Sequence, residues 1–330
     1  MGQRAFLESH TRRRLLAGAA AAAAMAPFGA FAQGISSRTV RFLLAQTAAT
    51  TPDVICRLLA PRFQQRWNQP FIVENRAGAA GAIGMEALAK AAPDGHTIQI
   101  MPTSILTLPL FFSNLPFDVL QSFQPISMVG NSNFALAVHS SVPANNVREF
   151  IAHARANPGL NYASPGNGTY HHIYMEQLRL ATGVQFTHIP YKGSAPAFND
   201  LLGGQVSAMF MPIHVAMGMA KDGRLKVLGG TMRERSPLFP GLPSIAEQGV
   251  LDFDGEQWYA MLGPAGMPAD IVAKYNAELR MILGEPELRE ILAKQGVVVK
   301  TSTPEELGRA LRAEYDALAR VVRAANIKGD

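Results

Sequence analysis

Short runs of β-forming residues alternate with helix-type segments from residue 38 onward, and this alternation restricts the possible folds more than any other feature. Residues 39–45 and 71–73 are β-rich, and 53–67 between them carry apolar side chains at helical spacing. Strands separated by helices form parallel sheets that are covered by helices on both faces. The pattern therefore predicts an α/β protein whose sheets are mostly parallel.

The alternation continues through most of the chain. Further strands are expected at 97–101, 160–163, 186–189, 206–211 and 225–228, and further helices at 82–91, 169–182, 194–202 and 213–220. Asn146-x-x-Glu149 and Thr303-Pro304-Glu305-Glu306 have the capping-box pattern of helix starts, and another helix is expected to begin at Pro268. Pro61 lies inside the segment 53–67, where we expect it to kink or break the helix.

Ligands of such folds bind at the carboxyl ends of strands, where loops lead into helix N-termini. The loop Ser164-Pro165-Gly166-Asn167-Gly168-Thr169 has this position. Its two glycines allow successive N–H groups to point at one spot, the helix dipole adds positive potential, and Ser164 and Thr169 add hydroxyls. The loop is thus either a site for a small anion or an ordinary capped turn.

The segment 46–53 holds the equivalent place after the first strand. Small and hydroxyl-bearing residues fill it, and Asp53 is expected to cap the following helix. By itself this loop is more typical of a structural turn. Two such loops after two different strands favour one anion held between them.

Other chemistries find less support. The single cysteine, Cys56, excludes an internal disulfide and a cysteine-built metal site, and it is expected to be a buried small side chain. Gly78-x-x-Gly81-x-x-Gly84 has the wrong spacing for a dinucleotide fingerprint and favours close packing at a helix start. His172 and Glu176 have zinc-ligand spacing, but no third ligand motif accompanies them, so structural roles are favoured.

An exported hydrolase that uses Ser164 is a disfavoured alternative. Ser164 lacks the G-x-S-x-G elbow, and no acidic residue lies near the histidines in sequence. The 330 residues, 48% apolar and 17% charged, are typical of a globular protein with room for two domains. The formal net charge of the chain is +5, and four of its arginines lie in the first 32 residues. The remainder is therefore almost neutral and offers no basic surface for nucleic acid.

The N-terminus has the three parts of a secretory signal. Thr11-Arg12-Arg13-Arg14-Leu15-Leu16 precedes an alanine-rich apolar run that ends at Ala30-Phe31-Ala32. The paired arginines are similar to those of twin-arginine signals. A membrane anchor is the alternative, but the run is too rich in alanine for a spanning helix. We therefore expect residues 1–32 to be a signal peptide cleaved between Ala32 and Gln33, and the protein to be periplasmic.

From about residue 38 to 325 the chain resembles the tripartite tricarboxylate transporter substrate-binding proteins, also called the Bug family. The resemblance rests on long motifs that occur in the same order. These are Pro52-Asp53 with Arg57-Leu58-Leu59, Val73-Glu74-Asn75-Arg76-Ala77-Gly78, Lys90-Ala91-Ala92-Pro93-Asp94-Gly95, Asn161-Tyr162-Ala163-Ser164-x-Gly166-Asn167-Gly168, His171-His172, His188-Ile189-Pro190-Tyr191-Lys192-Gly193-Ser194-Ala195-Pro196, Asp200-Leu201-Leu202-Gly203-Gly204-Gln205-Val206 and Arg235-Ser236-Pro237.

The resemblance implies a type II-like periplasmic binding protein with two α/β lobes joined by crossing strands. Residues 34–133 with 260–330 would form the first lobe and 134–259 the second, with the ligand cleft between them. It implies a monomer without enzymatic activity, cofactor or metal that delivers a carboxylate-bearing solute to membrane permease subunits. A sensor adaptor for a receptor kinase and a structural exported protein remain alternatives.

In this family two loops hold the solute through backbone N–H groups, hydroxyls and bridging waters. The resemblance implies the following ligand-binding residues: Ala48, Ala49, Thr50, Thr51, Thr103, Ser104, Ser164, Gly166, Asn167, Gly168, Thr169, His172, Lys192, Gly193, Asp200 and Met211. Lys192 is equally typical of a solvated loop, and Asp200 either orders its loop or faces the cleft.

Two segments depart from the family pattern. The first loop usually reads Pro-Gly-Gly-x-Thr-Asp, whereas this chain has Ala48-Ala49-Thr50-Thr51-Pro52-Asp53, in which the threonines would supply hydroxyl donors. The family often has Phe-Asp-Asn where this chain has Phe210-Met211-Pro212. A more apolar cleft would follow, and we expect a ligand with one carboxylate and an apolar or aromatic body.

Overall fold

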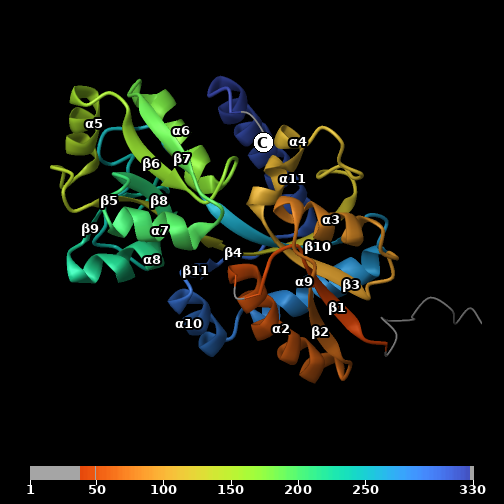
Figure 1. Cartoon of the computed structure of the whole chain (residues 1–330). Coiled ribbons are helices and arrows are strands. Elements are labelled where there is room, and N and C mark those ends of the chain that lie inside the picture. The colour runs from red at the N-terminus through yellow and green to blue at the C-terminus, as the bar shows by residue number, and fades with distance from the viewer. Residues whose placement is uncertain (1–37, 49, 328–330) are drawn as a thin grey trace, which may run out of the picture. The chain divides into compact units, whose positions relative to one another are not determined.

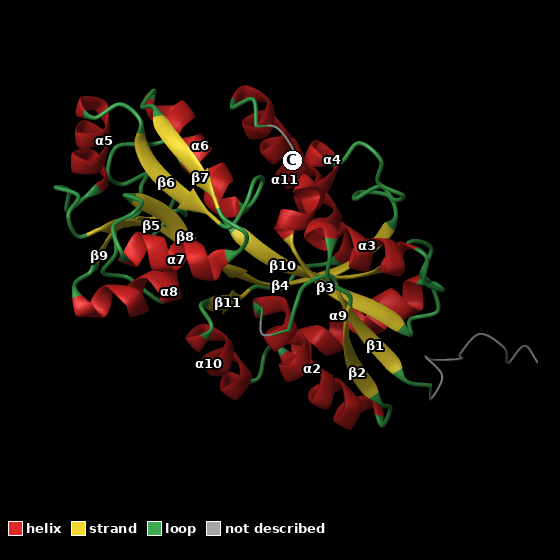
Figure 2. Cartoon of the chain, viewed as in Figure 1, coloured by secondary structure: helices red, strands yellow, loops and turns green. Residues whose placement is uncertain are grey.

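Two sheets with helices along their faces form the computed structural model, which describes residues 38–48 and 50–327 (Figures 1 and 2). The expected signal peptide, its cleavage site and Ala49 lie outside the described residues. The first sheet has six strands: β1 (Val40–Leu44), β2 (Phe71–Asn75), β3 (Thr97–Pro102), β4 (Phe123–Ser132), β10 (Gln257–Pro264) and β11 (Val297–Val299). The second has five: β5 (Phe134–His139), β6 (Leu160–Ser164), β7 (Phe186–Pro190), β8 (Ala208–Pro212) and β9 (Leu225–Gly230).

The strand orders are β11-β4-β10-β3-β1-β2 and β7-β6-β8-β5-β9. β1 pairs in parallel with β2 and β3, as β6 does with β7 and β8. β10 runs antiparallel to β3 and β4, β11 to β4, and β5 to β8 and β9. The sheets are thus mixed, although the sequence predicted mostly parallel ones. Only Asn133 separates β4 from β5, so the chain enters the second sheet without the crossover helix that parallel connections need.

Helices connect the strands as the alternation predicted. They are α2 (Thr51–Trp67), α3 (Ala82–Ala89), α4 (Leu108–Phe111), α5 (Val147–Ala156), α6 (Tyr170–Thr182), α7 (Ser194–Leu202), α8 (Ile213–Met219), α9 (Ala269–Ile282), α10 (Pro286–Lys294) and α11 (Pro304–Ala324). Short 3₁₀ turns are η1 (Ala79–Gly81), η2 (Thr103–Thr107) and η3 (Ala220–Asp222). The strands and helices that the sequence predicted with both ends are present, each end within two residues of its expected position.

Pro61 was expected to kink or break the helix; the break is wrong, because α2 continues through this residue as one helix. A proline in a helix removes one N–H donor and crowds the carbonyl four residues earlier, here that of Arg57. Both residues are exposed, so water can satisfy this carbonyl. The face that packs on the sheet is opposite, where Ile55, Leu59 and Phe63 are fully buried.

Local signals at the helix starts are confirmed. The Asn146 side chain accepts a hydrogen bond from the Glu149 N–H at 2.9 Å, and Thr303 and Glu306 form a complete capping box. Cys56 is a buried free thiol within α2. At Gly84 a Cβ would lie 2.5 Å from the Ala45 Cα, which confirms close packing at this helix start.

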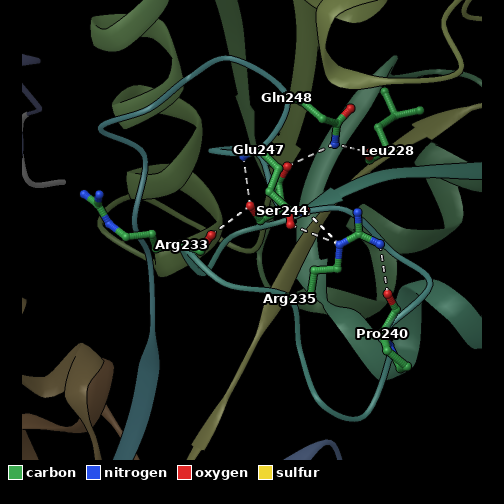
Figure 3. Close-up of polar contacts among 7 residues, drawn as sticks. All are labelled: Leu228, Arg233, Arg235, Pro240, Ser244, Glu247 and Gln248. Atoms are coloured by element: carbon green, nitrogen blue, oxygen red, sulfur yellow. Dashed lines mark hydrogen bonds and ion pairs between the residues drawn. The ribbon is translucent and has the colours of Figure 1, made fainter.

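The segment that returns the chain from β9 to β10 is held by a polar cluster around Arg235 (Figure 3). The Arg235 Nε donates to both carboxylate oxygens of Glu247, at 3.1 and 2.9 Å, and its Nη1 donates to the Pro240 carbonyl. Glu247 also accepts from the Ser244 N–H, and the Ser244 hydroxyl donates to the Arg233 carbonyl. The Arg235-Ser236-Pro237 motif therefore orders this return segment.

None of the helices in the described ranges 38–48 and 50–327 combines the length and the hydropathy that a membrane-spanning helix requires. The apolar residues instead pack inside. One core cluster joins residues of both sheets around Phe134, Tyr174 and Trp258, and a second lies in the second sheet around Met209 and Met211.

Candidate functional site

The loop 164–169 connects β6 to α6, and its backbone requires glycine at two points. Gly166 has φ +145° and Gly168 has φ +71°, a region that other residues rarely adopt. The Thr169 hydroxyl donates to the Gly166 carbonyl at 2.8 Å, so this N-cap residue leaves the first N–H groups of α6 without a side-chain cap. The α6 terminus therefore retains donors and a positive dipole end for an anion.

The side chains of Ser164 and His172 form hydrogen bonds that hold this loop in place. The Ser164 Oγ is fully buried, 2.6 Å from Nε2 of His188 and 3.0 Å from the Gly166 carbonyl. The His172 Nδ1 accepts the Gly168 N–H at 3.2 Å, and the two imidazole rings stack at 3.9 Å. Burial lowers the pKa of each histidine to about 4, so both are neutral near neutral pH.

The burial of Ser164 also bears on catalysis. A nucleophilic serine must present its Oγ to a substrate carbonyl, whereas this side chain has no exposed surface. The Ser164–His188 hydrogen bond thus has a structural role in the loop.

Glu176 forms structural contacts, as the sequence predicted. It accepts the Tyr162 hydroxyl at 2.9 Å and the Arg179 Nε at 2.7 Å. Among the residues that the structure describes, no group of three or more His, Cys, Asp and Glu side chains is arranged to hold a metal ion.

The segment 190–193 lies beside the loop 164–169. The Tyr191 N–H donates to the Ser164 carbonyl at 2.8 Å, and the Gly193 N–H donates to the Pro165 carbonyl at 3.1 Å. Asp200 accepts the Tyr191 hydroxyl at 2.6 Å, and burial together with this carboxylate raises the pKa of Tyr191 to about 12. Asp200 therefore orders this segment, while the Lys192 side chain is exposed.

The first loop is held by its own hydroxyls. Thr50 is the N-cap of α2 but donates its hydroxyl to the Thr47 carbonyl at 2.8 Å, and the Thr51 side chain hydrogen-bonds the Tyr259 hydroxyl. The expected capping role of Asp53 is wrong. This buried carboxylate lies within the first turn and binds Arg57, at 2.9 and 3.0 Å, because the two side chains are one helical turn apart.

Further residues of the expected site take different positions. Ala48 is exposed, and Thr103 is fully buried with its Oγ1 accepting the Trp258 N–H at 3.4 Å. Met211 is fully buried in the apolar core of the second sheet. In this conformation Met211 therefore presents no surface to a solute.

A pocket of about 270 Å³ opens between η2 and α4 on one side and the loop 164–169 on the other. Its lining residues are Ala80, Ser104, Thr107, Leu108, Phe111, Phe112, Asn167, Gly168 and Thr169. Of the expected site, Ser104, Asn167, Gly168 and Thr169 are brought together here. Of the other expected residues that the structure describes, none lines this pocket.

Sequence reasoning missed the apolar wall of the pocket, which consists mainly of Leu108, Phe111 and Phe112. The Phe111 ring lies against Gly168, where a Cβ would be 2.3 Å from Cε2 of the ring. The adjacent phenylalanines Phe111 and Phe112, shortly after β3 and η2, were the sequence signal from which this apolar wall could have been predicted. Phe112 is 40% exposed, which is unusual for so large an apolar side chain.

A polar contact beside the pocket joins α6 to α11. The Tyr170 hydroxyl donates to Oε1 of Glu314 at 2.9 Å. Burial raises the pKa of Glu314, and its hydrogen bonds to Tyr170 and Trp258 oppose that shift. Tyr170 follows Thr169 directly, so this contact fixes α11 against the start of α6.

Comparison with known proteins gives the same match at the levels of family, sequence and structure. Residues 55–327 match the model of the tripartite tricarboxylate transporter family receptor. The protein BugT of Bordetella pertussis is 32% identical over 295 residues, which cover 88% of this chain and 90% of BugT.

Two solved structures from Rhodopseudomonas palustris are also similar. One, determined with adipate, is 29% identical with a TM-score of 0.80 and covers 90% of this chain and 100% of its own. MatC, determined with malate, is 27% identical with a TM-score of 0.74 and covers 86% of this chain and 99% of its own. These likenesses confirm the two-lobed α/β fold that the sequence predicted.

Proposed function

The chain belongs to the tripartite tricarboxylate transporter receptor family, whose members are periplasmic solute-binding proteins, and we propose that it captures a small carboxylate-bearing solute for transport. The first 32 residues direct its export and are removed before Gln33. The solute binds between the two lobes, 34–133 with 260–330 and 134–259, and the carrier acts as a monomer. The related structures with adipate and malate support a carboxylate ligand.

The observation that carries this proposal is the pocket at the start of α6. Ser104, Asn167 and Thr169 bring polar groups to it, while no lysine, arginine or histidine lines it. Hydrogen bonds from N–H groups and hydroxyls to a carboxylate are charge-assisted and stronger than those between neutral groups. The uncapped α6 terminus adds the positive end of its dipole.

Closure of the lobes would couple binding to delivery. Contacts that the solute makes only in the closed form shift the hinge equilibrium toward closure, and a membrane permease then recognises that form. A sensor adaptor that presents the solute to a receptor kinase would use the same site. Deletion of the neighbouring permease genes separates the two, because only transport requires them.

A thermal-shift screen of the mature protein tests the proposal. The panel contains dicarboxylates, tricarboxylates, amino acids, nicotinate and benzoate-type acids. An acid present at one hundred times its dissociation constant adds about 2.7 kcal/mol, which raises the melting temperature of a chain of this size by several degrees. X-ray scattering with a binding acid should show a smaller radius of gyration. A melting temperature that no acid changes would contradict carboxylate binding.

A further inference from the structure

The pocket beside α6 has two sides of different chemistry. The polar side is the loop 164–169 with Asn167 and Thr169, and the apolar side is formed by Leu108, Phe111 and Phe112, next to Ser104 and Thr107 of η2. Among the described residues that line the pocket, none has an ionisable side chain. The pocket can therefore neutralise a negative charge only through dipoles and hydrogen bonds.

The hydrogen-bond donors lie at the start of α6 and on η2. The uncapped α6 terminus follows Thr169 directly, and Ser104 lines the same pocket from η2. One carboxylate can accept several of these donors. A second carboxylate on the same solute would then lie against the phenylalanine side chains, which offer no donor.

On the apolar side, the position of Phe111 is fixed by packing. The Phe111 ring rests against Gly168, so this ring cannot move toward the loop 164–169 without a clash. Phe112 lines this pocket and also a second one of about 480 Å³, whose other lining residues include Pro109, Leu115 and Tyr315. Phe112 is therefore the wall between the two spaces.

The second pocket contains one ionisable carboxylate and no basic side chain. Asp118 lines it and accepts the Leu120 and Gln121 N–H groups, at 2.7 and 3.0 Å. A solute carboxylate that passed Phe112 would meet this negative charge without a compensating cation. Burying a charge without a partner is strongly unfavourable.

From this division we infer that the solute carries a single carboxylate on an apolar body, and that Phe112 excludes acids with a second, distal carboxylate. The inference rests on the proposed function, since it concerns the same site. The carboxylate binds at the α6 terminus, and the body packs against Phe111 and Phe112. The adipate- and malate-bound relatives hold dicarboxylates, so this selectivity distinguishes the present chain from them.

Matched pairs of acids test the inference by isothermal titration of the exported protein at pH 7.5. Hexanoate and adipate have the same number of carbons and differ by one carboxylate, as do 4-methylbenzoate and terephthalate. We expect the single acid of at least one pair to bind ten-fold or more tightly than its diacid. Tighter binding of the diacid in both pairs would overturn the inference and leave the proposed function intact.

Variants at Phe112 assign the selectivity to this residue. In a pair that shows the preference, Phe112→Arg supplies a cation and should reduce the preference for the single acid at least ten-fold, whereas Phe112→Leu keeps the wall apolar and should still favour the single acid. The 40% exposure of Phe112 allows the longer side chain to be accommodated. An unchanged preference in Phe112→Arg would overturn the role of Phe112. Failure of every acid to bind the unaltered protein would refute the proposed function and the inference together.

Discussion

Replacement of Gly168 by alanine should destabilise the protein far more than the same change at Gly183, although the two residues have almost identical φ angles. Gly168 has φ +71° and Gly183 has φ +69°, so each alanine carries a similar backbone strain of about 1 kcal/mol. A Cβ at Gly183 meets nothing within 4 Å. At Gly168 it would lie 2.3 Å from Cε2 and 2.7 Å from Cδ2 of Phe111.

The clash sets the size of the difference. The half-buried Phe111 ring must move to admit a methyl group, and an overpacked contact of this kind costs about 1–3 kcal/mol. Gly168→Ala should therefore lower the free energy of unfolding by about 2–4 kcal/mol, against about 1 kcal/mol for Gly183→Ala. Both changes remove the same glycine entropy from the unfolded chain, so that contribution cancels in the comparison.

Urea unfolding of the four combinations of Gly168→Ala and Phe111→Ala measures the clash directly. In the Phe111→Ala background, Gly168→Ala should cost no more than the matched change at Gly183, which gives a coupling energy of at least about 1 kcal/mol. Equal losses for the two glycine variants, or additive effects of Gly168→Ala and Phe111→Ala, would refute the proposed contact between ring and loop.

Three further results are expected. Between pH 7 and 5.5 the free energy of unfolding should fall by about 1 kcal/mol for each of His172 and His188. In the unfolded chain these imidazoles have the ordinary pKa near 6.5 and become protonated in this range, whereas in the folded protein their pKa is about 4 and they stay neutral. Tyr170→Phe should cost about 1–3 kcal/mol, since it removes the hydroxyl that donates to the buried Glu314 carboxylate. Asp53→Asn should cost a similar amount, because this carboxylate is buried and paired. Urea midpoints measure all three.

Matched variants separate these effects from general damage. Tyr315→Phe, at the residue that follows Glu314 in α11, should have little effect, and Glu86→Gln breaks only an exposed pair with Lys90 that is worth less than about 1 kcal/mol. The pH effect should shrink when His188 is replaced by asparagine. Equal losses in Tyr170→Phe and Tyr315→Phe, or a urea midpoint that is flat from pH 7 to 5.5, would contradict the respective reasoning.

Local signals allowed the separate elements of the fold to be predicted, but not the partners of all strands. Helix starts such as Asn146 and Thr303 were readable because capping depends on residues three positions apart. Pairing depends on contacts between distant segments. β4 and β5 continue through Asn133 with no helix between them, and β10 pairs with β3 and β4 in antiparallel fashion. Periodicity alone carries no information on that arrangement.

The same distinction applies to the two sides of the candidate pocket. The polar side follows from the chain itself, because Gly166 and Gly168 set the backbone and Thr169 leaves the start of α6 uncapped. The apolar side comes from a different part of the fold, and its Phe111 ring lies against Gly168. On the proposed function, a substitution at Phe112 would alter which acid is accepted without disturbing the loop 164–169. The loop motifs that this chain shares with the family would then indicate carboxylate binding, whereas the residues after β3 would determine what the carboxylate is attached to.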